Sequence, residues 1–299
     1  MHTSVGVIGT GAMGLGVVRS LVRAGFPVLS RDIRTEAQAA SAAAGAVVCA
    51  SPEELARQCS TLILLVVDAA QVEEVLFGGG GAAAALSSGA IVIVSSTVAP
   101  ASVAALKPRL DSRGVRLIDA PVSGGPRRAA EGTITMMISG EPQTIRDCEA
   151  IFNAISARRF VLGAEPGVAA AYKILNNQLA AVNLAAGAEA MTIAVRAGID
   201  PLRLLEVVNA SSGASWMVAD RMPRALADDP TLQAAMRILN KDVGLAVEAA
   251  KALGLDAPLA RAARETFAAA VAAGYGETDD AALLAFCCRR AGVKFPRDA

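Results

Sequence analysis

The chain has 299 residues, of which 54% are hydrophobic and 19% charged, so it can form roughly two folded domains and is not a disordered protein. Its 28 basic and 28 acidic side chains give a formal net charge of zero, which argues against a nucleic-acid-binding protein. The only histidine is His2, which argues against a Ser-His-Asp triad and a histidine-based metal site, unless the N-terminus itself forms one. We therefore expect no metal, and proton chemistry that uses Lys, Asp, Glu, Tyr or Cys.

The cysteines and the apolar stretches indicate a cytoplasmic protein without a membrane span. No two cysteines form a C-x-x-C pair, and we expect reduced thiols, mostly in the core. The chain starts almost directly on a predicted strand, so we expect no signal peptide. The uncharged stretch from Val75 to Leu106 is interrupted by glycines and serines and is not predicted to cross a membrane. The cysteines are Cys49, Cys59, Cys148, Cys287 and Cys288.

The first half of the chain alternates short β-branched runs with alanine-rich helical stretches. The runs Leu62–Val67 and Ile91–Val94 are continuously apolar, which is typical of parallel strands covered on both faces. Ser51 can cap a helix that has Pro52 in its first turn. The alternation predicts an α/β fold with a doubly wound parallel sheet. Strands are predicted over Val5–Ile8, Pro27–Ser30, Ala46–Cys49, Leu62–Val67, Ile91–Val94 and Arg116–Ile118, and helices over Met13–Ala24, Pro52–Cys59, Ala70–Leu76 and Val103–Ser112.

The character of the sequence changes after about Val161, beyond which no convincing strand is predicted. The segment Gly163–Gly167 is a candidate boundary, and we predict two domains, residues 1–163 and 164–299. One long, mostly apolar helix is predicted over Ala169–Ala197 and joins the α/β domain to an all-helical domain. Further helices are predicted over Pro201–Ala210, Ser215–Ala227, Leu232–Ala250, Ala257–Ala273 and Ala281–Ala291.

A glycine-rich motif directly follows the first predicted strand and opens the first predicted helix. Its first glycine allows a tight turn, its second lets the backbone approach a pyrophosphate, and its third lets helix and strand pack closely. The start of the helix then offers free N–H groups to the phosphates. This position favours a dinucleotide-binding site over the alternative of a turn without a ligand. The predicted cofactor-binding residues are Gly9, Thr10, Gly11, Ala12, Met13 and Gly14.

Asp32 ends the second predicted strand, about 20 residues beyond the glycines. An acid at this position binds the hydroxyls of the adenosine ribose and repels a 2′-phosphate, so Asp32 favours NAD. Arg31 and Arg34 could instead pair with a 2′-phosphate, and NADP therefore stays an alternative. We interpret both arginines as solvated surface charges.

Polar segments follow three other predicted strands, at the edge where ligands bind in a doubly wound sheet. Val67 and Asp68 follow the fourth strand, and Thr97 comes after the fifth. The segment Ser123-Gly124-Gly125 comes after the sixth and offers a hydroxyl and backbone N–H groups to a carboxylate. Short segments of this kind are more often plain turns. Because all of them lie at the same edge of the sheet, we weigh a ligand-binding role and plain turns equally.

Lys173 lies near the start of the long predicted helix, and the residues after it are uncharged through Ala188. Asn177 lies four residues on and shares its helical face. Burial of a lysine among apolar residues lowers its pKa toward working pH, as a general acid or base requires. The alternative is a lysine that extends to water. We interpret Lys241-Asp242 as a surface pair and Trp216 as a core residue.

These motifs together resemble the β-hydroxyacid dehydrogenase family over nearly the whole chain. The glycine motif is shared with many enzymes, whereas four later segments are specific to this family. Three other segments, Val67–Gly78, Ser215–Met222 and Ala273–Asp280, are most similar to its branch that acts on L-threonate. The resemblance implies a Rossmann domain joined by the long helix to an all-helical domain, through whose helices subunits associate as homodimers or homotetramers. The specific segments are Asp119–Pro126, Ala130–Thr133, Lys173–Asn177 and Lys241–Val243.

The resemblance also implies roles for individual residues. Lys173 would be the catalytic residue, which hydrogen-bonds the reacting hydroxyl and relays its proton as hydride leaves for the nicotinamide. Ser123, Gly124 and Gly125 would hold the substrate carboxylate, and Asn177 would orient the substrate. The remaining contacts to the cofactor would come from Thr97 and Lys241, supported by Asp242.

We therefore expect an oxidoreductase that uses NAD, or NADP, to oxidise the hydroxyl of a small 3-hydroxy acid of the L-threonate or 3-hydroxyisobutyrate type. One alternative is a reductase of an aldehyde acid such as tartronate semialdehyde. Another is a dinucleotide-binding scaffold without turnover, against which Lys173 argues, because inactive relatives tend to lack the matching lysine. Where the family often has two glycines before the lysine, this chain has Gly167 and Ala169, and one added methyl group does not imply lost activity.

Overall fold

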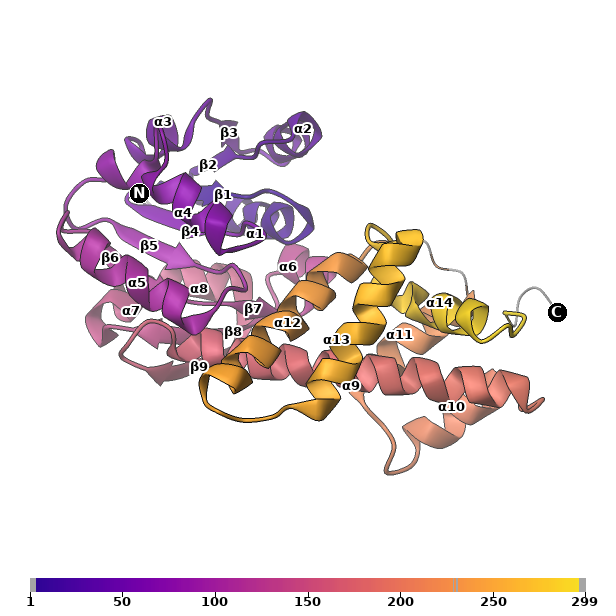
Figure 1. The fold of residues 1–299 in the computed structure, drawn as a ribbon. Helices are drawn as coiled ribbons and strands as arrows, with labels where there is room; N and C mark the ends of the chain where they lie inside the picture. The colour runs from indigo at the N-terminus through magenta and orange to yellow at the C-terminus, as the bar shows by residue number, and fades with distance from the viewer. Residues whose placement is uncertain (1–3, 228, 230, 296–299) are drawn as a thin grey trace. The chain divides into compact units, whose positions relative to one another are not determined.

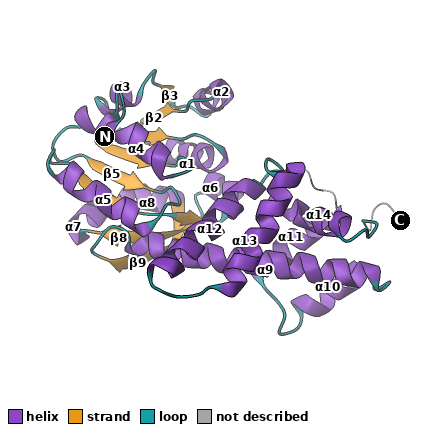
Figure 2. Ribbon diagram, in the orientation of Figure 1, coloured by secondary structure: helices purple, strands orange, loops and turns teal. Residues whose placement is uncertain are grey.

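The computed structural model describes residues 4–227, 229 and 231–295, so His2 lies outside the described residues. The chain divides into two compact units, Met1–Lys173 (unit 1) and Ile174–Ala299 (unit 2), and Figure 1 traces both. Figure 2 shows that the strands belong to unit 1. The domain boundary that we predict after residue 163 lies earlier than this division and stays a prediction.

Unit 1 is built on a nine-stranded sheet in which β1 and the strands on both sides of it are parallel. The strands are β1 (Val5–Ile8), β2 (Val28–Arg31), β3 (Val47–Val48), β4 (Thr61–Leu64), β5 (Ile91–Val94), β6 (Arg116–Asp119), β7 (Val122–Ser123), β8 (Ile134–Gly140) and β9 (Ser156–Gly163). Their order is β3-β2-β1-β4-β5-β6-β8-β7, with β9 paired to β8. The order reverses between β1 and β4, which is the switch point where a doubly wound sheet binds its ligand.

Helices cover both faces of this sheet and bury a separate core on each. On β4, Leu62 and Leu64 point into one core, and Ile63 points into the other. A strand buried on both faces shows no polar alternation, which explains the continuously apolar runs and confirms the predicted parallel sheet. The helices of unit 1 are α1 (Ala12–Arg23), α2 (Thr35–Ala43), α3 (Pro52–Ala56), α4 (Ala69–Phe77), α5 (Pro100–Asp111), α6 (Gly125–Glu131), α7 (Pro142–Asp147) and α8 (Glu149–Ile155).

The sheet contains three strands that the sequence does not predict, β7, β8 and β9. β8 pairs antiparallel with β6 and β7 and parallel with β9. β9 contains Arg158 and Arg159 and is exposed over much of its length, so it lacks the apolar signal of an inner strand. The predicted strand Leu62–Val67 ends at Leu64, and the Val67 N–H instead donates to Oε1 of Gln71.

Unit 2 is helical, as predicted. The long helix α9 (Val168–Arg196) begins in unit 1 and continues into unit 2. Among the described residues of unit 2, the only β pairing is a single bridge between Ala235 and Asp279. The remaining helices are α10 (Pro201–Asn209), α11 (Trp216–Ala227), α12 (Met236–Ala252), α13 (Pro258–Ala270) and α14 (Leu283–Arg290).

The prediction that Trp216 is a core residue is wrong. Trp216 is the first residue of α11 and is 56% exposed, and the guanidinium carbon of Arg221 lies 5.6 Å from the centre of its ring. An aromatic ring at the start of a helix can stack on a neighbouring arginine and still stay exposed, and composition alone does not distinguish this arrangement from burial.

The cysteines are free thiols, and all except the half-buried Cys287 are buried. Burial raises the pKa of the Cys59 and Cys148 thiols to about 12, so neither forms a reactive thiolate near neutral pH. Among the described residues, α9 is the one helix that is long and apolar enough to cross a membrane. Ala170 on this helix belongs to a core of unit 1, and Leu184 and Met191 belong to the core of unit 2.

Candidate active site

The glycine motif after β1 leaves backbone open where a side chain would not fit. Gly9 has a φ of +89°, and a Cβ atom there would lie 2.6 Å from the backbone oxygen of Leu65. A Cβ atom on Gly14 would lie 1.9 Å from the backbone oxygen of Gly9. Helix α1 begins at Ala12 after the N-cap Gly11, and no side chain caps its first N–H groups. This uncapped helix start and the absent side chains fit a dinucleotide pyrophosphate.

Asp32 lies directly after β2, at the same edge of the sheet, and is buried. Its Oδ2 accepts a hydrogen bond from the Thr10 N–H at 2.8 Å, and its Oδ1 accepts from the Arg34 N–H at 3.0 Å and from the Arg34 Nε at 3.2 Å. Burial alone would raise the pKa of Asp32, but the hydrogen bonds from Arg34 and Thr10 outweigh it and lower the pKa. The carboxylate is therefore ionised and tied to the glycine motif, which suits an acceptor for ribose hydroxyls.

Arg34 and Arg31 are both held at Asp32 rather than fully solvated. The Arg34 side chain is 56% exposed while it pairs with the Asp32 carboxylate, and the Arg31 guanidinium donates to the Asp32 backbone oxygen. The interpretation of both as solvated surface charges is thus incomplete. In this arrangement the Arg34 guanidinium forms an ion pair with Asp32.

The segments after β4 and β5 are the next predicted cofactor contacts. Asp68 is the N-cap of α4, where its Oδ1 accepts from the Gln71 N–H at 2.9 Å. The Val67 N–H donates to Oε1 of the same glutamine at 2.8 Å. These two bonds fix the shape of the loop after β4. Thr97 is half-buried in the loop between β5 and α5. The parallel strands β1, β4 and β5 bring these loops to one edge of the sheet with the glycine motif.

The segment Ser123-Gly124-Gly125 joins the short strand β7 to helix α6. Gly124 and Gly125 have φ values of +131° and +75°, which side-chain-bearing residues rarely adopt. Gly124 is the N-cap of α6 and supplies no side chain to cap it. Successive backbone N–H groups in such a turn form a concave anion site, and the half-buried Ser123 adds a hydroxyl. The geometry suits a carboxylate, and the binding of the substrate there stays a prediction.

Lys173 is buried, with only 7% of its surface exposed, in the second turn of α9. This burial excludes the alternative of a lysine that extends to water. The turn before it is held by two buried side chains that sequence reasoning did not select, Asp119 and Ser139. Oδ2 of Asp119 accepts from the N–H groups of Gly167 at 2.8 Å and Ala170 at 2.9 Å, and Oγ of Ser139 accepts from the Ala169 N–H at 3.0 Å.

Unit 2 contains a cluster of three predicted residues, Asn177, Lys241 and Asp242. Nδ2 of Asn177 donates to one oxygen of Asp242 at 2.7 Å, and Nζ of Lys241 lies 2.7 Å from the other. Asp242 is 3% exposed and Asn177 9% exposed, so the interpretation of Lys241-Asp242 as a surface pair is wrong. Among the described residues, no group of three or more His, Cys, Asp or Glu could hold a metal ion.

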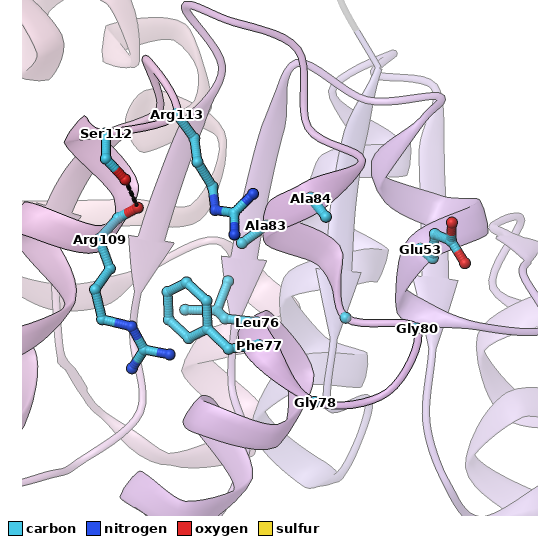
Figure 3. A pocket seen from close by; sticks show the side chains of 11 residues that line it. Glu53, Leu76, Phe77, Gly78, Gly80, Ala83, Ala84, Arg109, Ser112 and Arg113 are labelled. Atoms are coloured by element: carbon cyan, nitrogen blue, oxygen red, sulfur yellow. Dashed lines mark hydrogen bonds between the residues drawn. The ribbon is translucent and has the colours of Figure 1, made fainter.

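A hollow of about 430 Å³ in unit 1 lies away from these residues (Figure 3). It is lined by the ends of α4 and α5 and by the glycine loop after α4. The guanidinium carbon of Arg109 lies 3.6 Å from the centre of the Phe77 ring, and the side chain pairs with Glu73 at 2.6 Å. The helices end where the following strands begin, so this hollow belongs to the edge opposite the glycine motif. None of the predicted site residues lines it.

Each of the two units matches a known protein family over most of its length. Residues 4–163 match the family described as the NAD binding domain of 6-phosphogluconate dehydrogenase. Residues 167–287 match the family described as the NAD-binding domain of NADP-dependent 3-hydroxyisobutyrate dehydrogenase. The L-threonate dehydrogenase of Cupriavidus necator is 45% identical over 284 residues, which cover 95% of this chain and 96% of that protein.

Two solved structures are similar over nearly the whole chain. The 3-hydroxyisobutyrate dehydrogenase from Salmonella typhimurium has a TM-score of 0.88 and 38% identity, with 95% of this chain and 100% of that chain covered. The Mycobacterium tuberculosis 3-hydroxyisobutyrate dehydrogenase, determined with L-serine, has a TM-score of 0.85 and 28% identity, with 96% and 99% covered.

Proposed function

The chain belongs to the β-hydroxyacid dehydrogenase family, and we propose that it oxidises L-threonate, or a closely similar short hydroxy acid, with NAD. It is an NAD(P)-dependent hydroxyacid dehydrogenase. The observation that carries the choice of substrate is the 45% identity to an L-threonate dehydrogenase across 95% of this chain. A 3-hydroxyisobutyrate-type acid is the second candidate, supported by the 38% identical Salmonella structure.

Lys173 is the proposed proton relay. A bound NAD supplies the carbon that accepts a hydride. Lys173 in its neutral form takes the proton of the substrate hydroxyl while the substrate carbon that bears this hydroxyl loses a hydride to the cofactor, so the hydroxyl becomes a carbonyl. Its burial supports this role, because an amine shielded from water exchanges a proton with the bound substrate rather than with solvent. In the direction of reduction, the same amine returns the proton.

The other predicted residues bind and orient. We propose that the Ser123-Gly124-Gly125 turn holds the substrate carboxylate through its hydroxyl and backbone N–H groups. Asn177 orients the substrate, and its own amide is fixed by Asp242 at 2.7 Å. The remaining contacts to the cofactor come from the glycine motif, Asp32, Val67, Asp68, Thr97 and Lys241.

A substrate panel tests this function. With NAD, we expect kcat/KM for L-threonate to exceed that for D-glycerate, 3-hydroxyisobutyrate and L-serine by at least about tenfold, because a site built to hydrogen-bond a hydroxyl discriminates against acids that lack it. The absorbance of reduced nicotinamide measures turnover. A higher kcat/KM for another acid would move the assignment to that acid. Preferred turnover of tartronate semialdehyde with reduced cofactor would favour the reductase, and absence of turnover with all of them would favour a scaffold.

The cofactor preference is a second prediction. The ionised Asp32 repels a 2′-phosphate, so we expect a lower KM for NAD than for NADP. Asp32→Ala removes this repulsion and frees the Arg34 guanidinium, so the ratio of kcat/KM for NADP to that for NAD should rise at least about tenfold. The matched control is Asp256→Ala, which removes a carboxylate paired with Arg261 and should leave the ratio unchanged. A wild-type KM clearly lower for NADP would contradict the prediction.

A cytoplasmic homodimer or homotetramer is proposed as the working form. Tyr172, Leu175 and Leu179 are exposed apolar residues of α9 at helical spacing, and association of subunits would cover them. The free, mostly buried cysteines suit a reducing compartment.

A further inference from the structure

The first turn of α9 is bound to the sheet of unit 1 by two side chains that lie opposite each other on neighbouring strands. Asp119 is the last residue of β6, Ser139 lies on β8, and the two are direct partners in the antiparallel pairing. Both are completely buried. The Ser139 hydroxyl donates to Oδ2 of Asp119 at 3.3 Å and accepts from the Ala169 N–H at 3.0 Å. The register of β6 and β8 therefore fixes the positions of both side chains that bind the start of α9.

This group takes the place of an ordinary helix cap. The first N–H groups of a helix have no partner within the helix, and a nearby carboxylate binds them and complements the helix dipole. Here one oxygen of Asp119 serves the N–H groups of Gly167 and Ala170. Gly167 has a φ of +101°, and a Cβ atom there would lie 2.8 Å from the backbone oxygen of Pro100. The backbone conformation directly before α9 is therefore closely constrained.

Lys173 lies on the face of α9 that this group holds. It is three residues beyond Ala170 and four beyond Ala169, so it projects from the same side of the helix about one turn later. Both alanines are buried, as is Lys173 itself. A helix start that frays would let this lysine move, whereas a start with its N–H groups bound to a sheet keeps it in place.

We propose that Asp119 and Ser139 are positioning residues, which set the catalytic geometry of Lys173 by fixing the first turn of α9. The proposal rests on the proposed function, because it takes Lys173 as the proton relay. Oδ1 of Asp119 is buried and has no hydrogen-bond partner among the described residues, so the carboxylate is oriented through Oδ2 alone. Removal of that one acceptor therefore leaves the N–H groups of Gly167 and Ala170 without this partner.

The test uses Asp119→Ala, Asp119→Asn and Ser139→Ala in the full chain. We expect Asp119→Ala to lower kcat about 10- to 100-fold, because small displacements of a catalytic group have effects of this size, with KM for NAD within about twofold. Asp119→Asn keeps an acceptor oxygen and should recover most of the loss. The deuterium isotope effect on kcat, measured with substrate labelled at the reacting carbon, should increase as proton and hydride transfer become slower than the other steps.

Hydrogen exchange provides a readout that does not depend on activity. In Asp119→Ala and Ser139→Ala, the amides of residues 167–173 should exchange at least about tenfold faster than in the wild type, while those of β1 and β5 stay protected. The matched control is Asp200→Ala, which removes the cap of α10, where Asp200 Oδ1 accepts from the Leu202 N–H at 2.9 Å. This control should leave kcat and the isotope effect unchanged.

The outcomes separate the inference from the proposed function. If the wild type turns over no hydroxy acid, the proposed function fails, and exchange at residues 167–173 still decides whether the two side chains hold the helix start. If the wild type is active and both Asp119→Ala and Ser139→Ala match it in kcat, isotope effect and exchange, the positioning role is refuted. Should Asp119→Ala not fold, Ser139→Ala decides alone, and wild-type exchange at residues 167–173 with wild-type kcat in that variant would refute the role.

Discussion

Lys173→Met is expected to lower kcat for the hydroxy acid by about 1000-fold or more, since positioned acid–base groups contribute roughly 10²- to 10⁴-fold and the chain has no described histidine to replace it. Methionine has a similar length and suits the buried position, so the fold should survive. The measurement is steady-state turnover with the preferred acid, together with the dissociation constant for reduced cofactor from its fluorescence. The constant should change by no more than about twofold, because the pyrophosphate and ribose contacts come from other residues.

The control for this prediction is Lys251→Met, in the last turn of α12, where the lysine is exposed. It removes the same charge from the same residue type and should leave kcat unchanged. Near-normal turnover in Lys173→Met would refute the proton-relay role. Lost cofactor binding in that variant would instead place the lysine in the cofactor site.

The inner part of the sheet was predictable because its signal is local. Strands β1 and β5 begin and end at the predicted residues, since each is a continuous buried run with a serine at one end, Ser4 before β1 and Ser95 after β5. The glycine motif was equally readable, because its spacing follows from the backbone conformation that the turn requires. The predicted cap of α3 is also present, where Ser51 Oγ accepts from the Glu54 N–H at 3.1 Å.

The outer part of the sheet depends on pairing that no local pattern reveals. β9 carries adjacent arginines and lies beside β8, and its strand conformation comes from that neighbour rather than from its own composition. In the same way, the sequence shows Asp119 only as part of a segment after a strand. Asp119 accepts hydrogen bonds from Gly167 and Ala170, which lie 48 and 51 positions further along the chain. These bonds form because the fold brings the end of β6 to the start of α9.

The candidate site shows the same limit. Lys241 and Asp242 are neighbours in sequence, which is typical of a solvated pair, yet Asp242 is buried and accepts a hydrogen bond from Asn177, 65 positions away. The family resemblance pointed to these residues, whereas their spacing alone pointed to the surface. Residue type and spacing therefore identify candidate site residues, whereas the tertiary structure determines which of them are buried.

Arg221→Met is expected to destabilise the protein by about 3–5 kcal/mol, because it leaves a buried carboxylate without its partner. Nε of Arg221 donates to Oδ1 of Asp280 at 2.5 Å, and both side chains are buried in unit 2. The measurement is the midpoint of thermal unfolding at fixed pH. The matched control is Arg203→Met, which breaks an exposed pair with Glu206 and should cost no more than about 1 kcal/mol.

The effect of Arg221→Met should also depend on pH. Burial raises the pKa of Asp280 to about 6, while the charge and hydrogen bond of Arg221 oppose the rise. The unfolded chain releases this proton near pH 3.8, so between pH 3.8 and about 6 the native state binds more protons, and the contribution of Asp280 to stability falls as pH rises. Without Arg221 the native pKa lies higher still, and the window extends upward. The difference in midpoint between wild type and Arg221→Met should therefore grow from pH 6 to pH 8, and a difference independent of pH would show that the pair is not the cause of the lost stability.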